Sequence, residues 1–283
     1  MKKAVLFKAL QRHLGFRNPE SILQLTSEII KKLRPEELLL AERYLISLKD
    51  KGIHFTFPGD ELYPTSFYKM LEPPLFLEYV GEPVWMHKQI FAIVGSRKIH
   101  PFTDRWMRFE IPLFLEARPE IAIASGGAMG VDQCAHTVAI KSDRPTIVVL
   151  PCGVENLFPT NLNNLKKYVL QTGGCFLSEF ENDQSVRKHF FFFRNRLITA
   201  LANVTMVAQA EKKSGSFLTV HHALQNGRTV ITLPAHPMMF EFSGNQHLMR
   251  EGCFYVLTNK DLLNFWEAEC WSGRGLTLDI GCI

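Results

Sequence analysis

The segment IAIASGGAMGVD, residues 121–132, passes from an apolar run into a glycine-rich loop and then into an amphipathic stretch. The run 121–124 is apolar at every position, which is typical of a strand covered on both faces of a sheet. A strand that leads through a loop of small residues into a helix is the repeating unit of a parallel α/β sheet. The segment therefore predicts a parallel sheet with crossover helices.

The same alternation continues on both sides of this segment. Six further short apolar runs are found at residues 90–94, 146–150, 175–177, 204–208, 229–233 and 254–257. Amphipathic stretches that predict helices separate them, at about 102–117, 131–141, 161–171, 194–201, 216–226 and 245–250. Parallel strands joined by right-handed crossovers stack in one sheet. The fold class is therefore predicted as α/β, an extended Rossmann-like, doubly wound and mostly parallel sheet.

The first part of the chain has a different pattern. Apolar residues recur near helical spacing at 6–14 and 22–33, and Pro35 is placed where a further helix could begin. Residues 54–57 are compatible with a short strand, and a turn-rich connector follows. We predict a small N-terminal helical domain with its connector at 1–82, a Rossmann-like domain at 83–258, and a C-terminal helix and tail at 259–283. The tail after about residue 268 is expected either to be loosely ordered or to dock by Trp271.

Composition narrows the class of protein. The 283 residues are 46% hydrophobic and 21% charged, with a net charge of +4, and residues 83–258 alone carry +5. This bias is compatible with a polyanion partner but is too small for a purely electrostatic DNA binder. No apolar run approaches the length of a membrane helix, and the first residues do not resemble a secretory signal, so we expect no membrane association and a cytoplasmic protein.

The cysteines give no sign of a metal site or a disulfide framework. None of the six forms a C-x-x-C pair, and several lie in or beside apolar runs: Cys134, Cys152, Cys175, Cys253, Cys270 and Cys282. Structural zinc requires paired ligands at short spacing. We therefore expect reduced, partly buried thiols and no metal.

Small residues follow four of the predicted strands, at the sheet edge where α/β proteins bind ligands. Backbone N–H groups in such loops, next to helix N-termini, favour anions, and Arg97 adds a forked phosphate donor. The alternative is that these residues only make tight turns and helix caps. We expect a phosphate-binding ridge made of Gly95, Ser96, Arg97, Ser125, Gly126, Gly127, Gly130, Lys213, Ser214 and Gly215.

A second group of cations surrounds four consecutive phenylalanines, residues 190–193. Cations interleaved with aromatic rings suit single-stranded nucleic acid, because phosphates pair and bases stack. We predict DNA contacts from Arg194, Asn195 and Arg196, and a further one from Lys166, while most of the four phenylalanines pack in the core or at a dimer contact. The motifs of dinucleotide-binding and Walker A loops are absent from the sequence, so no cofactor is expected.

Three ionisable residues near the ridge are predicted to support it. Asp132 and His136 have i, i+4 spacing on one helix, and Glu179 follows a strand. Asp132 would hold loop N–H groups and His136 would be satisfied in the packing. With no nucleophile beside them, we expect no catalysis by these residues.

In the order and type of its motifs the sequence resembles the DNA-processing protein A (DprA/Smf) family. The resemblance covers about residues 60–257 and includes Tyr63-Pro64, Gly95-Ser96-Arg97, the segment 125–132, Arg194-Asn195-Arg196, Ser214-Gly215-Ser216 and Gly244-Asn245. The family often has a basic residue where Met129 stands, Glu where Gln209 stands, and Gly where Ala235 stands.

The resemblance implies a non-enzymatic homodimer that binds single-stranded DNA, protects incoming strands during natural transformation and helps to load the RecA-type recombinase. Two alternatives remain open from the residues alone. One is a Rossmann-like nucleotide-binding or nucleotide-processing protein, with Glu179 or Asp132 as the carboxylate over a ribose. The other is a scaffold whose DNA site has decayed, for which Met129 is the hint.

Overall fold

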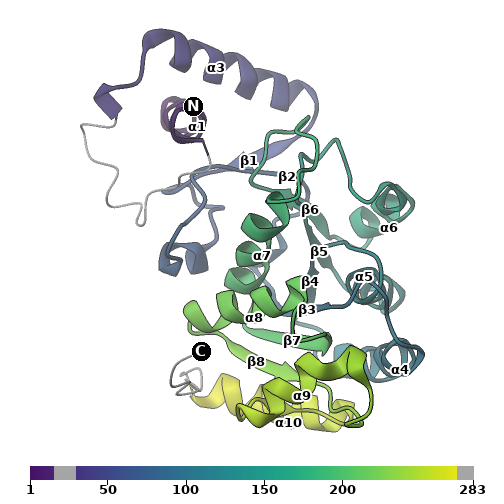
Figure 1. Ribbon diagram of the computed structural model, residues 1–283. Helices are drawn as coiled ribbons and strands as arrows, with labels where there is room; N and C mark the ends of the chain where they lie inside the picture. Colours follow the sequence, from purple (N-terminus) through teal and green to yellow (C-terminus); the bar gives the residue numbers. More distant parts are fainter. Residues whose placement is uncertain (16–29, 273–283) are drawn as a thin grey trace.

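A computed structural model describes residues 1–15 and 30–272, with the side chains of 269–272 excepted. Predicted features at residues 16–29, the side chains of Cys270 and Trp271, and Cys282 lie outside the described part. The fold is centred on one sheet of nine strands, in the order β1-β2-β6-β5-β4-β3-β7-β8-β9 (Figure 1). The α/β, mostly parallel class predicted from the sequence is confirmed.

The seven predicted strands form the parallel part of this sheet. They are β3 (Gln89–Gly95), β4 (Ile121–Ser125), β5 (Thr146–Val149), β6 (Cys175–Ser178), β7 (Val204–Gln209), β8 (Thr229–Thr232) and β9 (Phe254–Tyr255). β3 pairs in parallel with both β4 and β7. The chain therefore builds the sheet outward from β3 in one direction, through β4, β5 and β6, and then returns to build it in the other. The point at which the direction reverses lies between β3 and β7.

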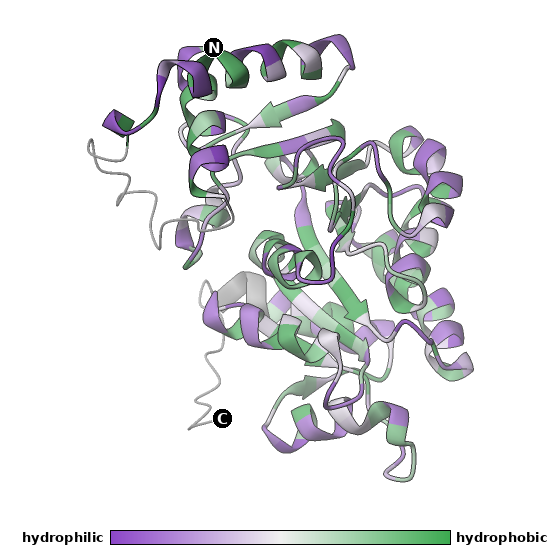
Figure 2. Cartoon of the chain, turned by 45° about the horizontal axis from the view of Figure 1, so that its top comes forward, coloured by the Kyte–Doolittle hydropathy of each residue, from purple (hydrophilic) through white to green (hydrophobic). Residues whose placement is uncertain are grey.

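Helices cover both faces of the parallel sheet, as strands buried on both faces require. On one face lie α4 (Pro101–Ala117), α5 (Val131–Lys141), α6 (Asn163–Gln171) and α10 (Asn259–Ser272). On the other lie α7 (Phe190–Leu201), α8 (Gly215–Gln225) and α9 (Ser243–Arg250). The strands between them are hydrophobic, whereas the helices carry hydrophilic residues on their outer sides (Figure 2). Among the described residues, no helix is long and apolar enough to cross a bilayer.

The phenylalanine run lies inside a helix, which differs from the prediction. We expected the helix to begin at 194, but α7 begins at Phe190. Successive residues of a helix are rotated by about 100°, so the four rings point in different directions. Phe190 is fully buried and stacks on Phe180 with a centroid separation of 4.1 Å, whereas Phe192 is 45% exposed. Burial of Phe190 against the core explains why the helix starts a turn earlier.

The N-terminal segment packs on one end of the sheet. It contains α1 (Lys2–Leu14), α3 (Pro35–Asp50), β1 (His54–Thr56) and β2 (Leu77–Gly81), with short 3-10 turns η2 (Thr65–Lys69) and η3 (Val84–Met86). β1 pairs with β2, and β2 pairs antiparallel with β6. The predicted helices at 6–14 and from 35 onward are therefore present, and two strands from before residue 82 also join the sheet. The division into domains at 82 and 258 stays a prediction.

A buried ion pair joins the N-terminal helices to the sheet. Lys8 Nζ lies 2.9 Å from Glu78 Oε1, and both side chains are almost completely buried. The hydroxyl of Tyr44 on α3 lies 2.8 Å from the same oxygen. Buried charges must be paired and hydrogen-bonded, so these contacts fix the helices over the β2 end of the sheet.

The described cysteines agree with the expectation from the sequence. Cys134, Cys152, Cys175 and Cys253 are buried and are not joined in disulfides. Apolar core residues surround them, and Cys134 also donates from Sγ to Asp104 Oδ1 at 3.3 Å. They are structural thiols of the hydrophobic core.

Candidate nucleic-acid interface

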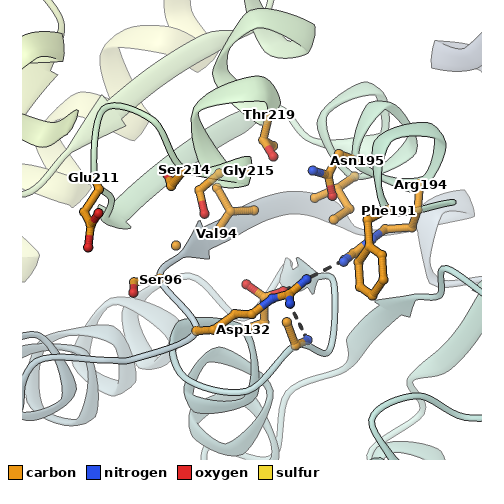
Figure 3. A pocket seen from close by; sticks show the side chains of 15 residues that line it. Val94, Ser96, Asp132, Phe191, Arg194, Asn195, Glu211, Ser214, Gly215 and Thr219 are labelled. Atoms are coloured by element: carbon orange, nitrogen blue, oxygen red, sulfur yellow. Dashed lines mark hydrogen bonds and ion pairs between the residues drawn. The ribbon is translucent and has the colours of Figure 1, made fainter. Parts of the chain in front are cut away.

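A pocket of about 290 Å³ opens at the point where the order of the sheet reverses (Figure 3). Ligands of open α/β sheets bind at this point because the loops after the two neighbouring strands diverge to opposite faces. Here the loop after β3 leads to α4 and the loop after β7 leads to α8. Together with the start of α7 they supply most of the lining: Val94, Gly95, Ser96, Arg97, Ala128, Asp132, Phe191, Arg194, Asn195, Ile198, Glu211, Ser214, Gly215, Ser216 and Thr219.

The loop after β4 packs against the loop after β3, which lines the pocket, and it requires glycine at positions 126 and 130. Gly130 has a φ of 81°, and a Cβ there would lie 2.3 Å from the carbonyl oxygen of Ser96. The N–H of Val131 donates to that same oxygen at 3.1 Å. The two loops can approach so closely only because residue 130 has no side chain.

Gly126 has a second reason to be glycine. A Cβ at this position would lie 1.1 Å from Nη1 of Arg194, so the guanidinium occupies the space that a side chain would fill. Arg194 is 3% exposed, and its Nη1 lies 3.9 Å from Oδ2 of Asp132. The N–H of Ala128 also donates to Asp132, at 3.3 Å. The glycine-rich loop and Asp132 together hold Arg194 in place.

Arg194 has donors that no described residue accepts. Within the described part of the chain, neither its Nε nor its Nη1 has a hydrogen-bond acceptor. Burial lowers the pKa of Arg194 and raises that of Asp132, and the attraction between the two opposes both shifts. An arginine keeps its charge in proteins even so. A buried guanidinium with unused donors beside a pocket is suited to the oxygens of an anionic ligand.

Arg97 contributes a second cation to the pocket. Its side chain is exposed, and its guanidinium carbon is 4.9 Å from the centre of the Phe191 ring. The guanidinium of Arg194 lies 5.9 Å from the same ring. Phe191 therefore contacts both cations, and this cation–π arrangement keeps their charges close to the pocket.

The N-terminus of α8 forms the opposite wall. Gly215 is the first residue of α8, and Ser214 precedes it with an extended backbone. The first N–H groups of a helix have no partner within the helix, and the helix dipole favours negative charge there. The Ser214 hydroxyl is buried, and no described residue accepts from it or donates to it. Lys213 is exposed next to this turn, while Glu211, also exposed, contributes a negative charge to the lining.

Gln209 holds the segment that carries Arg97 in place through three hydrogen bonds. The backbone carbonyl of Gln209 accepts from the N–H of Ser96 at 2.7 Å, and its side-chain Oε1 accepts from the N–H of His100 at 2.7 Å. Its Nε2 donates to Lys98 O at 3.2 Å. A glutamate at this position could not make this last bond, so glutamine is matched to this loop.

Half of the fourteen expected DNA contacts line the pocket, namely Gly95, Ser96, Arg97, Arg194, Asn195, Ser214 and Gly215. The other seven do not line it: Ser125, Gly126, Gly127, Gly130, Lys166, Arg196 and Lys213. Arg196 is 5% exposed, and its Nη2 lies 2.6 Å from both carboxylate oxygens of Glu179. The Ser125 hydroxyl is buried and donates to Ile93 O at 2.6 Å, which ties β4 to β3. Lys166 is on α6 and does not line the pocket. Arg196 and Ser125 thus make structural contacts within the fold, and their contacts with DNA stay predictions.

His136 lies in the packing beneath the loop. Thr146 donates its hydroxyl to Ile123 O at 3.0 Å, so the Nδ1–H of His136 donates to Thr146 Oγ1 at 2.7 Å. Burial, aided by the charge of Arg194, lowers the pKa of His136 to about 3. The imidazole is therefore neutral at neutral pH and adds no charge to the pocket.

Some lining residues were not predicted from the sequence. Glu211 and Ser216 lie in the loop and first turn after β7, where the sequence already predicts ligand contacts, so the sequence contains the signal for both. Thr219, one turn into α8, required knowledge of the helix start. Met129, which replaces a basic residue of the family, is 56% exposed beside the lining.

Comparison with known proteins gives one consistent answer. The family model described as "DNA recombination-mediator protein A" matches residues 54–267. Protein Smf of Escherichia coli is 32% identical over 213 residues, which are 74% of this chain and 56% of that protein. DNA processing protein DprA of Streptococcus pneumoniae is 29% identical over 208 residues, 74% of this chain and 72% of that protein. The match thus spans little more than half the length of the E. coli relative.

Two solved structures share the fold. The X-ray structure of DNA processing protein A from S. pneumoniae superposes with a TM-score of 0.73 at 25% identity and covers 93% of this chain and 94% of that one. DNA processing protein A from Helicobacter pylori, solved to describe its single-stranded DNA binding mode, superposes with a TM-score of 0.67 at 28% identity, over 76% of this chain and 97% of that one.

Proposed function

Because the chain belongs to the DNA recombination-mediator protein A family, we propose that it binds single-stranded DNA at the pocket between β3 and β7. The observation that carries this proposal is the buried Arg194, whose Nε and Nη1 find no acceptor among the described residues while the side chain lines the pocket. The positive charge of this guanidinium would attract a phosphodiester group that enters the pocket. Arg97 and the first N–H groups of α8 would contact the same or the next phosphate.

The chemistry of the lining supports binding without reaction. Of the two carboxylates that we considered for nucleotide processing, Glu179 is held by Arg196 and does not line the pocket. Asp132 is buried against Arg194, where its role is to position that cation. The proposed mechanism is thus to hold the sugar-phosphate backbone, with little dependence on base sequence and strong dependence on salt.

In this proposal the protein is a mediator of recombination in the cytoplasm. A strand held by its phosphates is protected, yet it can be handed to a RecA-type recombinase because no covalent step traps it. We further propose that the protein acts as a homodimer. The transfer to a recombinase and the homodimer are both proposed from membership of the family, and they go beyond the DNA site described above.

A competition experiment tests the DNA assignment against the nucleotide alternative. A fluorescently labelled oligo-dT is bound to the protein and displaced, in separate titrations, with unlabelled oligo-dT, a duplex of equal length, and free dTMP or ATP. We expect oligo-dT to displace the probe at far lower concentration than the duplex, because the narrow pocket accepts a single backbone. Displacement by a free nucleotide at micromolar concentration, with weak competition by oligo-dT, would instead assign the pocket to nucleotides.

A further inference from the structure

A second hollow, the aromatic groove, lies at the same edge of the sheet. Its volume is about 370 Å³, and it opens where β8 and β9 end and α4 begins. Since the strand order is β3-β7-β8-β9 and neighbouring strands are about 4.8 Å apart, this groove is only a few strand spacings from the phosphate pocket. The residues that shape it include Phe102, Trp106, His236, Met239, Phe242 and Leu257.

The groove contains one strongly exposed ring, Phe102, and one partly exposed ring, Trp106, while Phe242 is buried. Phe102 is 70% exposed, although it is a large apolar side chain. Trp106 forms part of the wall and is fixed by donating from Nε1 to the carbonyl oxygen of Leu257 at 2.7 Å. The ring of His100 bridges Phe102 and Phe242, with centroid separations of 4.9 and 5.7 Å. Exposed apolar side chains gathered in one place mark a surface that binds something.

One short segment connects the groove to the phosphate pocket. Residues 95–97 line the pocket, and Phe102 and Thr103 line the groove. Gln209 holds both ends of the intervening stretch through its bonds to Ser96 and His100. A ligand that leaves the pocket along the ends of β7 and β8 therefore passes directly over Phe102.

Charge on the connecting surface favours a continuing polyanion. Lys98 lies between the two sites, and Arg105 follows one turn into α4, and both side chains are exposed. Glu241, whose carboxylate lies 3.7 Å from Nε2 of His100, is the opposing charge at the rim. The size of the groove is that of a small-ligand site, whereas a protein partner needs a much broader apolar surface.

We propose that the aromatic groove is a base-stacking subsite that takes one or two unpaired bases of the strand whose phosphates occupy the pocket. This inference rests on the proposed function. Phosphates alone would fix the backbone, and stacking of bases on Phe102 would add affinity for single strands over duplexes, whose bases are already stacked. Aromatic rings stack on any base, so the subsite adds no sequence preference.

The test compares two ligands that differ only in their bases. One is an oligo-dT of about 20 nucleotides, enough to span a site of the usual size. The other has the same sugar-phosphate backbone with stable tetrahydrofuran abasic units. We expect Phe102→Ser to weaken binding of oligo-dT about tenfold and to leave binding of the abasic strand unchanged. Phe102→Tyr, which keeps a flat ring, should bind both ligands as the wild type does.

A matched control is present on the same helix. Phe109 is 67% exposed, lies two turns further along α4 and does not line the groove. Phe109→Ser removes a comparable exposed ring and should not change either affinity. Because Phe102 and Phe109 are both exposed, neither substitution removes core packing.

The outcomes separate the inference from the proposed function. If Arg97→Ala weakens both ligands but Phe102→Ser weakens neither, or weakens both equally, the base-stacking subsite is disproved and the phosphate pocket stands. If the wild type binds neither ligand, the proposed function itself fails. If Phe102→Ser lowers the mass measured by sedimentation and leaves the ratio of the two affinities unchanged, the groove belongs to a second copy of the chain.

Discussion

Replacing Gly126 with alanine is expected to weaken single-strand binding by about ten- to a hundredfold while the protein remains folded. The added methyl group would lie 1.1 Å from Nη1 of Arg194 and 2.2 Å from its Cζ, so the guanidinium must leave its place beside Asp132. Charge-assisted hydrogen bonds contribute about 1.5–3 kcal/mol each, which corresponds to this loss in affinity. Anisotropy with a labelled oligo-dT measures the change, and circular dichroism checks the fold.

A double-mutant cycle shows whether the effect of Gly126→Ala acts through Arg194. If it does, Gly126→Ala combined with Arg194→Ala should bind no more weakly than Arg194→Ala alone, because the residue that the methyl group displaces is already gone. Additive losses would show that the methyl group disturbs the loop for another reason. Unchanged binding by Gly126→Ala would contradict the role given to Arg194.

Arg196→Met is expected to lower stability strongly and to leave strand binding by the folded protein nearly unchanged. Its partner Glu179 would lose the guanidinium that lies 2.6 Å from both of its carboxylate oxygens in the interior, and breaking a buried ion pair in this way costs about 3–5 kcal/mol. For a chain of this size that is a fall in Tm of about 10 °C. Urea denaturation and thermal scans at one fixed pH measure the loss.

Two further variants serve as a rescue and a control for this result. Arg196→Met with Glu179→Leu removes both charges and should recover much of the lost stability. Arg43 is exposed on α3, so Arg43→Met should change stability by less than about 0.5 kcal/mol. If Arg196→Met were stable but failed to bind DNA, Arg196 would be a DNA contact after all, as the sequence alone predicted.

The contrast between Arg194 and Arg196 shows where sequence reasoning stops. Both belong to one Arg-Asn-Arg motif, and the sequence gives no reason to separate them. Two positions along a helix correspond to a rotation of about 200°, so the two side chains must point to nearly opposite sides. Arg194 meets the pocket, and Arg196 meets Glu179 in the interior. The helix phase depends on its start at Phe190, which packing against Phe180 determines.

The strands were predictable because short runs that are apolar throughout, and that alternate with helical stretches, are typical of strands buried on both faces. Their C-terminal ends then bring Ser96, Arg97 and Ser214 together without any knowledge of the strand order, since all parallel strands end at the same edge. The pairing of β2 with β6 was not predictable, because it joins residues about 97 positions apart. Lys166 does not line the pocket, and the sequence alone does not show which way a basic side chain on α6 points, so its DNA contact stays a prediction.

The central claim is that phosphates of a single strand bind at the pocket between β3 and β7. The most direct test is the salt dependence of oligo-dT binding for the wild type, Arg97→Ala and, as a control, Arg43→Ala at a distant exposed site. For single strands, each phosphate contact contributes about 0.7 to the slope of log K against log salt. We predict that Arg97→Ala weakens binding at low salt and flattens the slope by about this amount, and that Arg43→Ala matches the wild type. Equal slopes for all three proteins would contradict the claim.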